Sequence, residues 1–390
     1  MPAVAPRHSI AVVYAGLFFG IGVYLPFFPV WLTGRDFSAS MIGFALAVPM
    51  AVRLATMPLG GLLADRTGRP RATLIGYALA TACCFVGVVL APDAALMLVA
   101  LGLAASFWQP SLPVLDAYTV ARRAEGLVDY GRVRLWGSLS FIAGNLASGL
   151  VLRVFPADAL IWMIVAGSLV AAFAACALQP DARPLPEPAR PRGAASARAR
   201  LPRALRIGIA AAALVQGSHA LLYAFGSIQW REAGLSDTAI GGLWAVGVLA
   251  EVVLFRSGTR ITALIGAERL LLAGGLAGLA RFGAMALDPP VVLLPFLQVL
   301  HAGTFGCTYL GTVELVARLA PAGRGAATQA MAAWAVAIVM TGATLASGPL
   351  WQALGPLAFA ASALMAGGGA VLALLAYADR PQPQSAGSGG

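Results

Sequence analysis

The sequence contains no lysine, so all 26 of its strongly basic residues are arginine. Charged residues make up only 11% of the chain, against about 25% in soluble domains. Its four cysteines lie within apolar stretches and lack the spacing of metal ligands. No His-Glu-x-x-His motif, Gly-x-Ser-x-Gly motif or acidic metal-binding cluster is present. These absences argue against a soluble protein, a metal site and an enzyme, and nothing in the sequence indicates a cofactor.

Long apolar runs recur along the whole chain, which is 59% hydrophobic. Each run is long enough to cross the hydrocarbon core of a bilayer, about 30 Å thick, as a helix. The first run is too long for a cleaved signal peptide and has no small-residue cleavage site after it. We therefore predict an all-α integral membrane protein with 12 transmembrane helices, at approximately 10–32, 41–63, 72–91, 94–118, 134–154, 158–178, 206–229, 239–257, 268–287, 290–316, 326–350 and 354–377.

The net charge of +10 comes from arginines that are unevenly distributed between the predicted loops. Most of them fall in alternate loops, whereas the opposite loops hold only Arg35, Arg153 and Arg231. An excess of basic residues in cytoplasmic loops is typical of bacterial inner-membrane proteins. We therefore expect both termini in the cytoplasm, a cell inner membrane location, the lipid bilayer as a partner and no nucleic acid.

The longest break between apolar runs is 179–205, which is rich in proline, arginine and alanine. Such a composition is typical of a flexible linker. It divides the chain into an N-terminal six-helix bundle at 1–178 and a C-terminal six-helix bundle at 206–378, followed by a disordered tail at 379–390. Two six-helix halves are expected to be related by pseudo-symmetric internal repetition.

A charged turn, Asp65-Arg66-Thr67-Gly68-Arg69, joins the second and third apolar runs. Charged, irregular backbone is too costly in hydrocarbon, so these residues mark a tight hairpin at the membrane surface. The spacing Gly-x-Leu-x-Asp-Arg-x-Gly-Arg resembles the loop between helices 2 and 3 of major facilitator superfamily transporters. That resemblance implies a conformational gate on the cytoplasmic side, formed by Asp65, Arg66, Gly68 and Arg69.

Three ionisable residues of the second half fall at similar depth inside predicted helices: Glu251, Arg281 and His301. A charge at the bilayer centre costs about 2.5–3.5 kcal/mol on insertion scales, so each should face a cavity or a partner. A desolvated carboxylate can hold a proton and release it when a cation approaches, which favours a proton-coupling site. The alternatives are a fixed Glu251–Arg281 pair and a histidine that is merely hydrogen-bonded within its helix.

The first half also places ionisable residues in its helices, namely Arg53, Asp116 and Arg134. An arginine that faces a cavity suits a carboxylate or a hydroxyl-rich ligand, because its planar fork binds two oxygens at once. The alternatives are a cytoplasmic gate or topology anchor for Asp116 and Arg134, and a packing role for Arg53.

Polar residues at helical spacing extend this candidate substrate site. One helix face is predicted to carry Arg134, Ser138, Phe141 and Asn145, and a second face carries Gln216, His219 and Tyr223. Tyr24 belongs to an aromatic run in the first helix, where the alternative role is a membrane-interface anchor.

Four segments, YLPFFPVWL, VDYGRVRLWGS, QGSHALLYAFGSIQW and LHAGTFG, resemble the phenylpropionate permease group and, more distantly, lactose permease. By that resemblance, Asp116 and Arg134 match the sugar-binding acid and arginine, and Phe141 replaces a sugar-stacking tryptophan. Arg281 and His301 match in register, but Thr304 stands where an essential carboxylate is expected. The resemblance therefore implies that proton coupling would depend on Glu251.

Together these features predict a monomeric secondary transporter, not an enzyme, that works by alternating access. We expect uptake of a small organic solute by proton symport, with an aromatic carboxylate such as 3-phenylpropionate as the candidate. The alternatives are a sugar or nucleoside proton symporter and an exporter of small molecules. The expected substrate-binding residues are Arg134, Asp116, Arg53, Phe141, Asn145, His219 and Tyr24, and the expected proton-coupling residues are Glu251, Arg281 and His301.

Overall fold

The computed structural model describes residues 6–179 and 200–379, without the side chains of Pro6 and of residues 57–65. The predicted flexible linker and disordered tail therefore fall largely outside the described residues, at 180–199 and 380–390. Within the described part of the chain, the first half forms six helices: α1 (Pro6–Thr33), α2 (Ala39–Thr67), α3 (Pro70–Leu90), α4 (Ala94–Ala124), α5 (Tyr130–Val151) and α6 (Ala159–Cys176).

The second half differs because two of its membrane passages contain a π-helical turn. The first such passage is α7 (Arg203–Gly217), η2 (Leu222–Gly226) and α8 (Ser227–Glu232). The second is η3 (Val291–Leu293), α12 (Leu294–His301), η4 (Ala302–Cys307) and α13 (Thr308–Leu319). The remaining elements are α9 (Asp237–Arg256), α10 (Gly258–Ile265), α11 (Ala267–Ala286), α14 (Gly325–Leu354), η5 (Gly355–Ala358) and α15 (Phe359–Ala378).

These helices make twelve membrane passages, as the apolar runs predict. Ten stretches of the described residues are long and apolar enough to cross a bilayer, and the last of them contains both α14 and α15. Helix α5 is a further passage, although two arginines and several serines lower its hydropathy. The short helix α10 was not predicted and lies in the segment expected to be a loop after α9.

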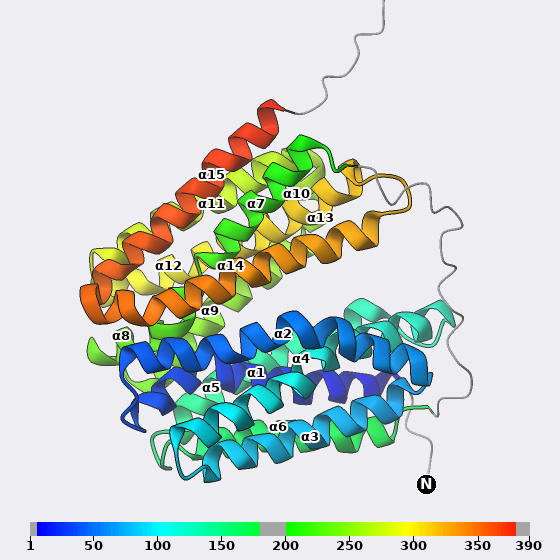
Figure 1. The fold of residues 1–390 in the computed structure, drawn as a ribbon, viewed down its shortest axis with the longest axis vertical. Coiled ribbons are helices and arrows are strands. Elements are labelled where there is room, and N and C mark those ends of the chain that lie inside the picture. The colour runs from blue at the N-terminus through cyan, green and yellow to red at the C-terminus, as the bar shows by residue number, and fades with distance from the viewer. Residues whose placement is uncertain (1–5, 180–199, 380–390) are drawn as a thin grey trace, which may run out of the picture.

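Helices α1–α6 pack together in one half of the molecule and α7–α15 pack together in the other (Figure 1). In the first half α1 lies against α5 and α6, and in the second half α15 lies against α7 and α11. The backbones approach closely where glycine removes a side chain. A Cβ atom at Gly22 of α1 would lie 2.3 Å from the carbonyl oxygen of Phe141 in α5. This crossing fixes the position of Phe141 along the axis of α1.

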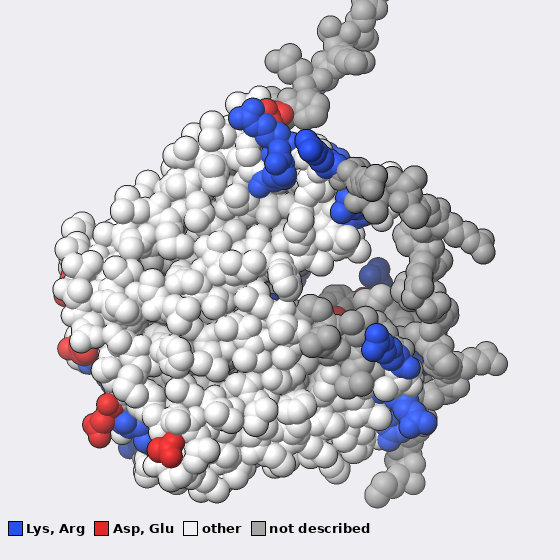
Figure 2. All heavy atoms as spheres, in the orientation of Figure 1, with Lys and Arg blue, Asp and Glu red and all other residues white. Residues whose placement is uncertain are grey.

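The two halves meet mainly where α2 packs on α14 and α5 packs on α9. At one end of the molecule this contact is tight, because a Cβ atom at Gly348 would lie 2.5 Å from the carbonyl oxygen of Ala39. The Ser40 hydroxyl donates a hydrogen bond to Gln352 Oε1 across the same contact, at 2.7 Å. A hollow lies between the halves at the other end, where most of the visible arginine side chains gather (Figure 2).

The predicted gate segment connects α2 to α3 at this arginine-rich end. Gly68 has a φ of 60°, a left-handed conformation that glycine adopts without strain, and it allows α3 to begin at Pro70. Arg66 and Arg69 are exposed. The side chain of Asp65 lies outside the described residues, so the gating role of this segment stays a prediction.

Candidate functional site

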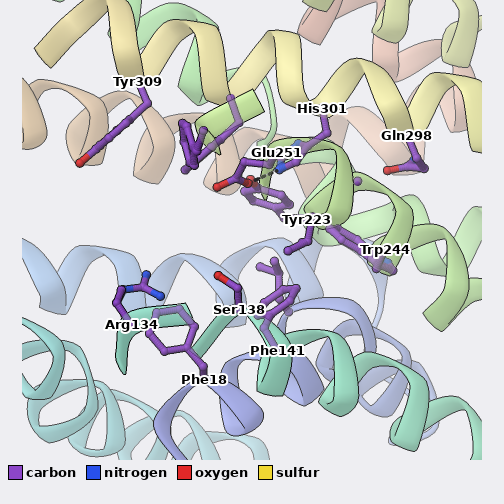
Figure 3. A pocket seen from close by; sticks show the side chains of 15 residues that line it. Phe18, Arg134, Ser138, Phe141, Tyr223, Trp244, Glu251, Gln298, His301 and Tyr309 are labelled. Carbon is purple, nitrogen blue, oxygen red and sulfur yellow. Dashed lines mark ion pairs between the residues drawn. The ribbon is translucent and has the colours of Figure 1, made fainter. Parts of the chain in front are cut away.

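A cavity of about 390 Å³ lies between the two halves (Figure 3). Helices α1 and α5 form one wall, whereas η2, α9 and the α12–η4–α13 passage form the other. Seven of its fifteen lining residues are aromatic. The lining residues are Phe18, Leu25, Arg134, Ser138, Phe141, Tyr223, Trp244, Gly247, Val248, Glu251, Phe255, Gln298, His301, Phe305 and Tyr309.

Arg134 is the cation of the first wall. Its guanidinium carbon lies 4.1 Å from the ring centre of Phe18 and 5.7 Å from that of Tyr14. No ion pair or hydrogen bond joins it to another residue in the described part of the chain. Ser138 and Phe141 follow on the same face of α5 and also line the cavity. This wall therefore presents an arginine that packs against aromatic rings and makes no hydrogen bond or ion pair with the described residues.

Glu251 is the acid of the opposite wall. Its Oε2 lies 3.6 Å from Nε2 of His301, which is within ion-pair range but longer than a normal hydrogen bond. Figure 3 shows Glu251 and His301 above the cavity, with Arg134 and Ser138 across from them. The two walls thus place one acid opposite one unpaired arginine.

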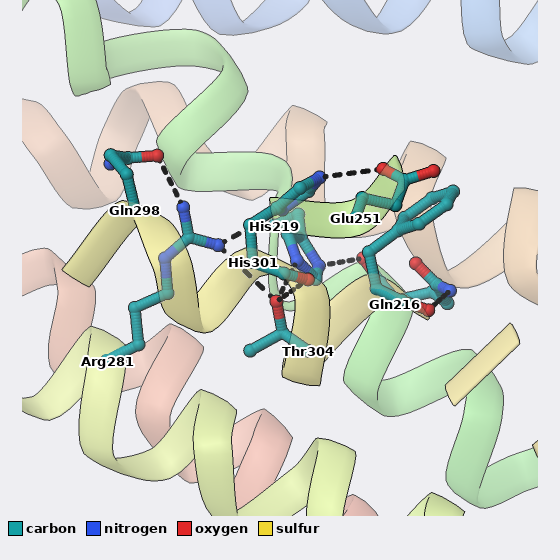
Figure 4. Close-up of polar contacts among 8 residues, drawn as sticks. Gln216, His219, Glu251, Arg281, Gln298, His301 and Thr304 are labelled. Carbon is teal, nitrogen blue, oxygen red and sulfur yellow. Dashed lines mark hydrogen bonds and ion pairs between the residues drawn. The ribbon is translucent and has the colours of Figure 1, made fainter. Parts of the chain in front are cut away.

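Arg281 lies behind His301 and is completely buried. Its Nη2 donates a hydrogen bond to Gln298 Oε1 at 2.7 Å, and its Nη1 lies 3.3 Å from His301 Nδ1 (Figure 4). Arginine has only donors, so His301 Nδ1 must accept and therefore carries no proton. The imidazole proton is then on Nε2, directed toward Glu251. Arg281 and Glu251 both contact His301, and no direct ion pair between them, the alternative considered from the sequence, is present.

His219 forms a second layer behind this group. Its Nδ1 faces the carbonyl oxygens of Val215 and Gln216, so Nδ1 carries the proton. Its Nε2 then accepts the hydroxyl proton of Thr304 at 2.8 Å. The Thr304 oxygen in turn accepts from Arg281 Nη1 at 3.4 Å. His219 supports the position of Arg281 and does not line the cavity.

Both π-helical turns carry residues of this site. Tyr223 is in η2, one turn after His219, while Thr304 and Phe305 are in η4, directly after His301. A π-helical turn inserts one extra residue into a helix and is frequent at functional sites. Here the turns rotate the polar faces of two passages toward Arg281 and the cavity.

Besides His219, four other predicted substrate residues do not line the cavity. Asp116 accepts hydrogen bonds from Tyr14 and Tyr130, Tyr24 stacks on Phe28 within the first half, and Arg53 is exposed on α2. The Asn145 side chain is completely buried, and neither atom of its amide has a partner among the described residues. The roles of these residues in binding remain predictions.

Several lining residues were not predicted, and most of them are aromatic. Trp244, Val248, Glu251 and Phe255 follow one face of α9 at intervals of four, three and four residues. This periodicity is visible in the sequence and could have identified Trp244 and Phe255 once Glu251 was chosen. Gln298, His301, Phe305 and Tyr309 likewise follow one another at intervals of three, four and four residues, so the choice of His301 could have identified Phe305 and Tyr309.

Comparison with known proteins places the whole chain among transporters. The sequence model of the MFS_1 like family matches residues 8–361. The chain is 31% identical over 369 residues to an Escherichia coli (strain K12) protein named "Probable 3-phenylpropionic acid transporter", covering 92% of this chain and 94% of the relative. It is 27% identical over 327 residues to the maltose permease of Geobacillus stearothermophilus, covering 82% and 81%.

Solved structures share the fold at low sequence identity. The nucleoside transporter NupG superposes with a TM-score of 0.79 at 15% identity, covering 97% of this chain and 100% of that one. The D-xylose-proton symporter superposes with a TM-score of 0.71 at 15% identity, covering 96% of this chain and 98% of that one. An inward-facing, unoccupied bacterial homologue of the lysosomal transporter Spinster gives 0.73 at 13% identity, covering 97% and 98%.

Proposed function

The chain belongs to the MFS_1 like family of membrane transporters, and from this membership we propose that it imports a small aromatic carboxylate together with a proton. It is a multi-pass membrane protein that carries a small molecule and is not an enzyme. The observation that carries the proposal is the cavity itself. Seven of its fifteen lining residues are aromatic, with an unpaired arginine on one wall and the Glu251–His301–Arg281 group on the other.

The substrate class follows from the first wall. A carboxylate can accept two parallel hydrogen bonds from the planar guanidinium of Arg134, and an aromatic ring attached to it would pack against Phe18, Phe141 and Trp244. The similarity to the protein named as a 3-phenylpropionic acid transporter supports the same class. We therefore take 3-phenylpropionate as the test substrate.

The proton would be carried by Glu251. Around the cavity, the described side chains include two cations, Arg134 and Arg281, and one acid, Glu251. Protonation of Glu251 leaves both cations uncompensated, which favours entry of an anionic substrate. Once the substrate is released on the other side, the two cations again favour the ionised form of Glu251. Binding of the carboxylate and of the proton are thus mutually supportive, as symport requires.

Transport would follow from movement of the two halves, 1–178 and 206–378, relative to each other. With both termini in the cytoplasm, the arginine-rich end faces the cytoplasm and the present conformation is open inward. We propose that the protein is a monomer in the inner membrane, since the whole cavity is built from one chain.

A sugar or nucleoside symporter is the second candidate. The similarity to maltose permease supports it, and aromatic walls can also stack on a sugar. An exporter of small molecules is a third, because the direction of transport follows from the gradients that are imposed.

The proposal is tested by uptake of radiolabelled 3-phenylpropionate and of a panel of sugars and nucleosides into proteoliposomes. A pH gradient and a membrane potential are imposed separately. Symport of one proton with one monocarboxylate moves no net charge, so a pH gradient alone should give roughly tenfold accumulation per pH unit. A neutral solute carried with a proton would instead gain about 2.3 kcal/mol per 100 mV of potential. Potential-driven uptake of a sugar or nucleoside would replace this proposal with the second candidate.

Replacement of Glu251 tests the proton-carrying role. Glu251→Gln should abolish accumulation driven by the pH gradient, because the amide cannot release a proton. Exchange of labelled for unlabelled 3-phenylpropionate across the membrane should persist. The matched control is Glu232→Gln, since Glu232 is exposed at the end of α8, away from the cavity. Undiminished accumulation by correctly inserted Glu251→Gln protein would remove Glu251 from the mechanism.

A further inference from the structure

Asp116 and Arg134 are oppositely charged residues of neighbouring helices, yet they do not form an ion pair. Arg134 lines the cavity, and Asp116 does not. An arginine and a carboxylate attract each other strongly where water is scarce. Something must therefore satisfy Asp116 in place of Arg134.

Tyr14 of α1 lies between them. Its hydroxyl donates a hydrogen bond of 2.5 Å to Asp116 Oδ1, while its ring centre lies 5.7 Å from the guanidinium carbon of Arg134. One side chain thus contacts the acid with its polar end and faces the cation with its ring. Tyr14 is completely buried, so this geometry is fixed by the packing around it.

Tyr130 contacts the same carboxylate oxygen from a second helix. Its hydroxyl donates to Asp116 Oδ1 at 3.2 Å. Tyr130 precedes Arg134 by four residues on α5, so both side chains start from one face of that helix. The position that Tyr130 occupies beside Asp116 is therefore one that the long side chain of Arg134 could otherwise approach.

The energetic consequence concerns the binding of an anion. A guanidinium held by Asp116 would have to break that pair before it could bind a substrate carboxylate. Hydrogen bonds to charged groups are stronger than neutral ones, so two phenol donors are an effective replacement for the arginine.

We propose that Tyr14 and Tyr130 are positioning residues that occupy Asp116 and so keep Arg134 available for an anionic substrate. The part of this inference that concerns the substrate rests on the proposed function, in which Arg134 binds a carboxylate. The part that concerns the state of Arg134 does not depend on the identity of the substrate.

The first experiment measures the availability of Arg134 directly. Phenylglyoxal modifies free guanidinium groups, and peptide mass spectrometry gives the extent of labelling at Arg134. In the double variant Tyr14→Phe, Tyr130→Phe, labelling of Arg134 should fall about tenfold, as expected when a pairing worth about 1.4 kcal/mol forms. Adding Asp116→Asn should restore labelling to within about twofold of the original protein.

Tyr24→Phe is the matched control. Tyr24 is on the same helix as Tyr14, and its buried hydroxyl has no partner among the residues described, so its removal should leave the labelling unchanged. The melting temperature of each variant is measured alongside. If the double variant does not fold, the single variant Tyr130→Phe replaces it, because it removes only the longer hydrogen bond. Labelling of Arg134 should then fall by a smaller factor, and adding Asp116→Asn should restore it.

The second experiment measures the dissociation constant of 3-phenylpropionate by calorimetry with the same proteins. The double variant should bind about tenfold more weakly, and Asp116→Asn should rescue it. Failure of Asp116→Asn to restore the affinity of the double variant would overturn the inference. Restored labelling without any binding of 3-phenylpropionate would overturn the proposed function and leave the role of the tyrosines intact.

Discussion

Thr304 is the residue that connects the two histidines of the second half. Its hydroxyl donates to His219 and accepts from Arg281, which in turn faces His301. The resemblance to lactose permease marks this position as the place of a missing acid. In the structure the threonine has a different role, since its single hydroxyl donates to a buried histidine and accepts from one nitrogen, Nη1, of a buried arginine.

Replacement of this hydroxyl by a methyl group should be costly. Thr304→Val leaves His219 Nε2 without a donor, and an unsatisfied buried group costs about 1–3 kcal/mol. We expect a lower melting temperature in detergent and slower uptake. The control is Thr308→Val, one turn further on. The Thr308 hydroxyl is also completely buried but has no hydrogen-bond partner among the described residues, so its loss should be neutral or stabilising. Equal effects of the two substitutions would contradict the bridging role of Thr304.

Individual cavity residues could be predicted where helix periodicity and charge agree. Arg134 and Phe141 were found because they share one face of α5, and Glu251 and His301 because charges inside a membrane need a cavity or a partner. Periodicity gives the direction of a side chain but not its depth. Asn145 therefore shares the predicted face with Arg134 yet is buried, and Tyr24 packs within the first half.

At the level of helices, Asp158 joins three elements at the closed end. Its Oδ1 accepts hydrogen bonds from Arg35 at 2.9 Å and from Trp31 Nε1 at 2.8 Å. Arg35 also donates to the carbonyl of Val89 at the end of α3. The contact thus holds the end of α1, the end of α3 and the start of α6 together. Partial burial acts to raise the pKa of Asp158, but the hydrogen bonds and the charge of Arg35 lower it below its ordinary value.

The stability that this contact contributes should depend on pH. A lowered pKa in the folded protein means that the contribution is present above the unfolded value, about 3.9, and is lost as the pH falls through the folded value. Asp158→Asn should therefore lower the melting temperature at pH 7, and the difference from the original protein should shrink as the pH falls below about 3.9. The control is Asp93→Asn, at the N-cap of α4, which removes a carboxylate that forms no ion pair with the described residues. A difference that persisted unchanged at pH 3 would rule out the ionised contact.

The positions of the helices could largely be predicted, but their internal irregularities could not. Apolar length alone identifies the membrane passages, because a bilayer requires about 20 residues in each. The π-helical turns η2 and η4 depend on tertiary contacts around His219 and Arg281, which leave no periodic signal in the sequence. Helix α10 is too short and too polar to register as an apolar run.

For the whole molecule, the close contact between α2 and α14 holds one end shut. Gly43 and Gly348 allow the two backbones to touch, and the Ser40–Gln352 hydrogen bond lies beside them. The alternating access that we propose requires this contact to separate when the opposite end closes. The contact should therefore influence the relative populations of the two conformations.

A larger side chain at this contact should favour the conformation in which α2 and α14 are separated. Gly348→Ala places a carbon 2.5 Å from the backbone oxygen of Ala39, which cannot move aside alone. We expect maleimide labelling of a Ser40→Cys reporter to rise several-fold in a background without the four native cysteines. Gly342→Ala, on the same helix, is the control because nothing lies within 4 Å of the added carbon. Equal labelling in the two variants would show that this contact does not limit opening.

The position of Arg281 has one more consequence, which concerns the passage of protons through His301. An imidazole passes a proton along only when one nitrogen receives it while the other gives one up. Arg281 holds His301 Nδ1 in the accepting state and offers it a permanent cation, so the ring cannot conduct in this way. A proton that arrives at Glu251 has no onward path through His301. In the proposed mechanism the proton must therefore enter and leave Glu251 through the cavity, which is also the path of the substrate.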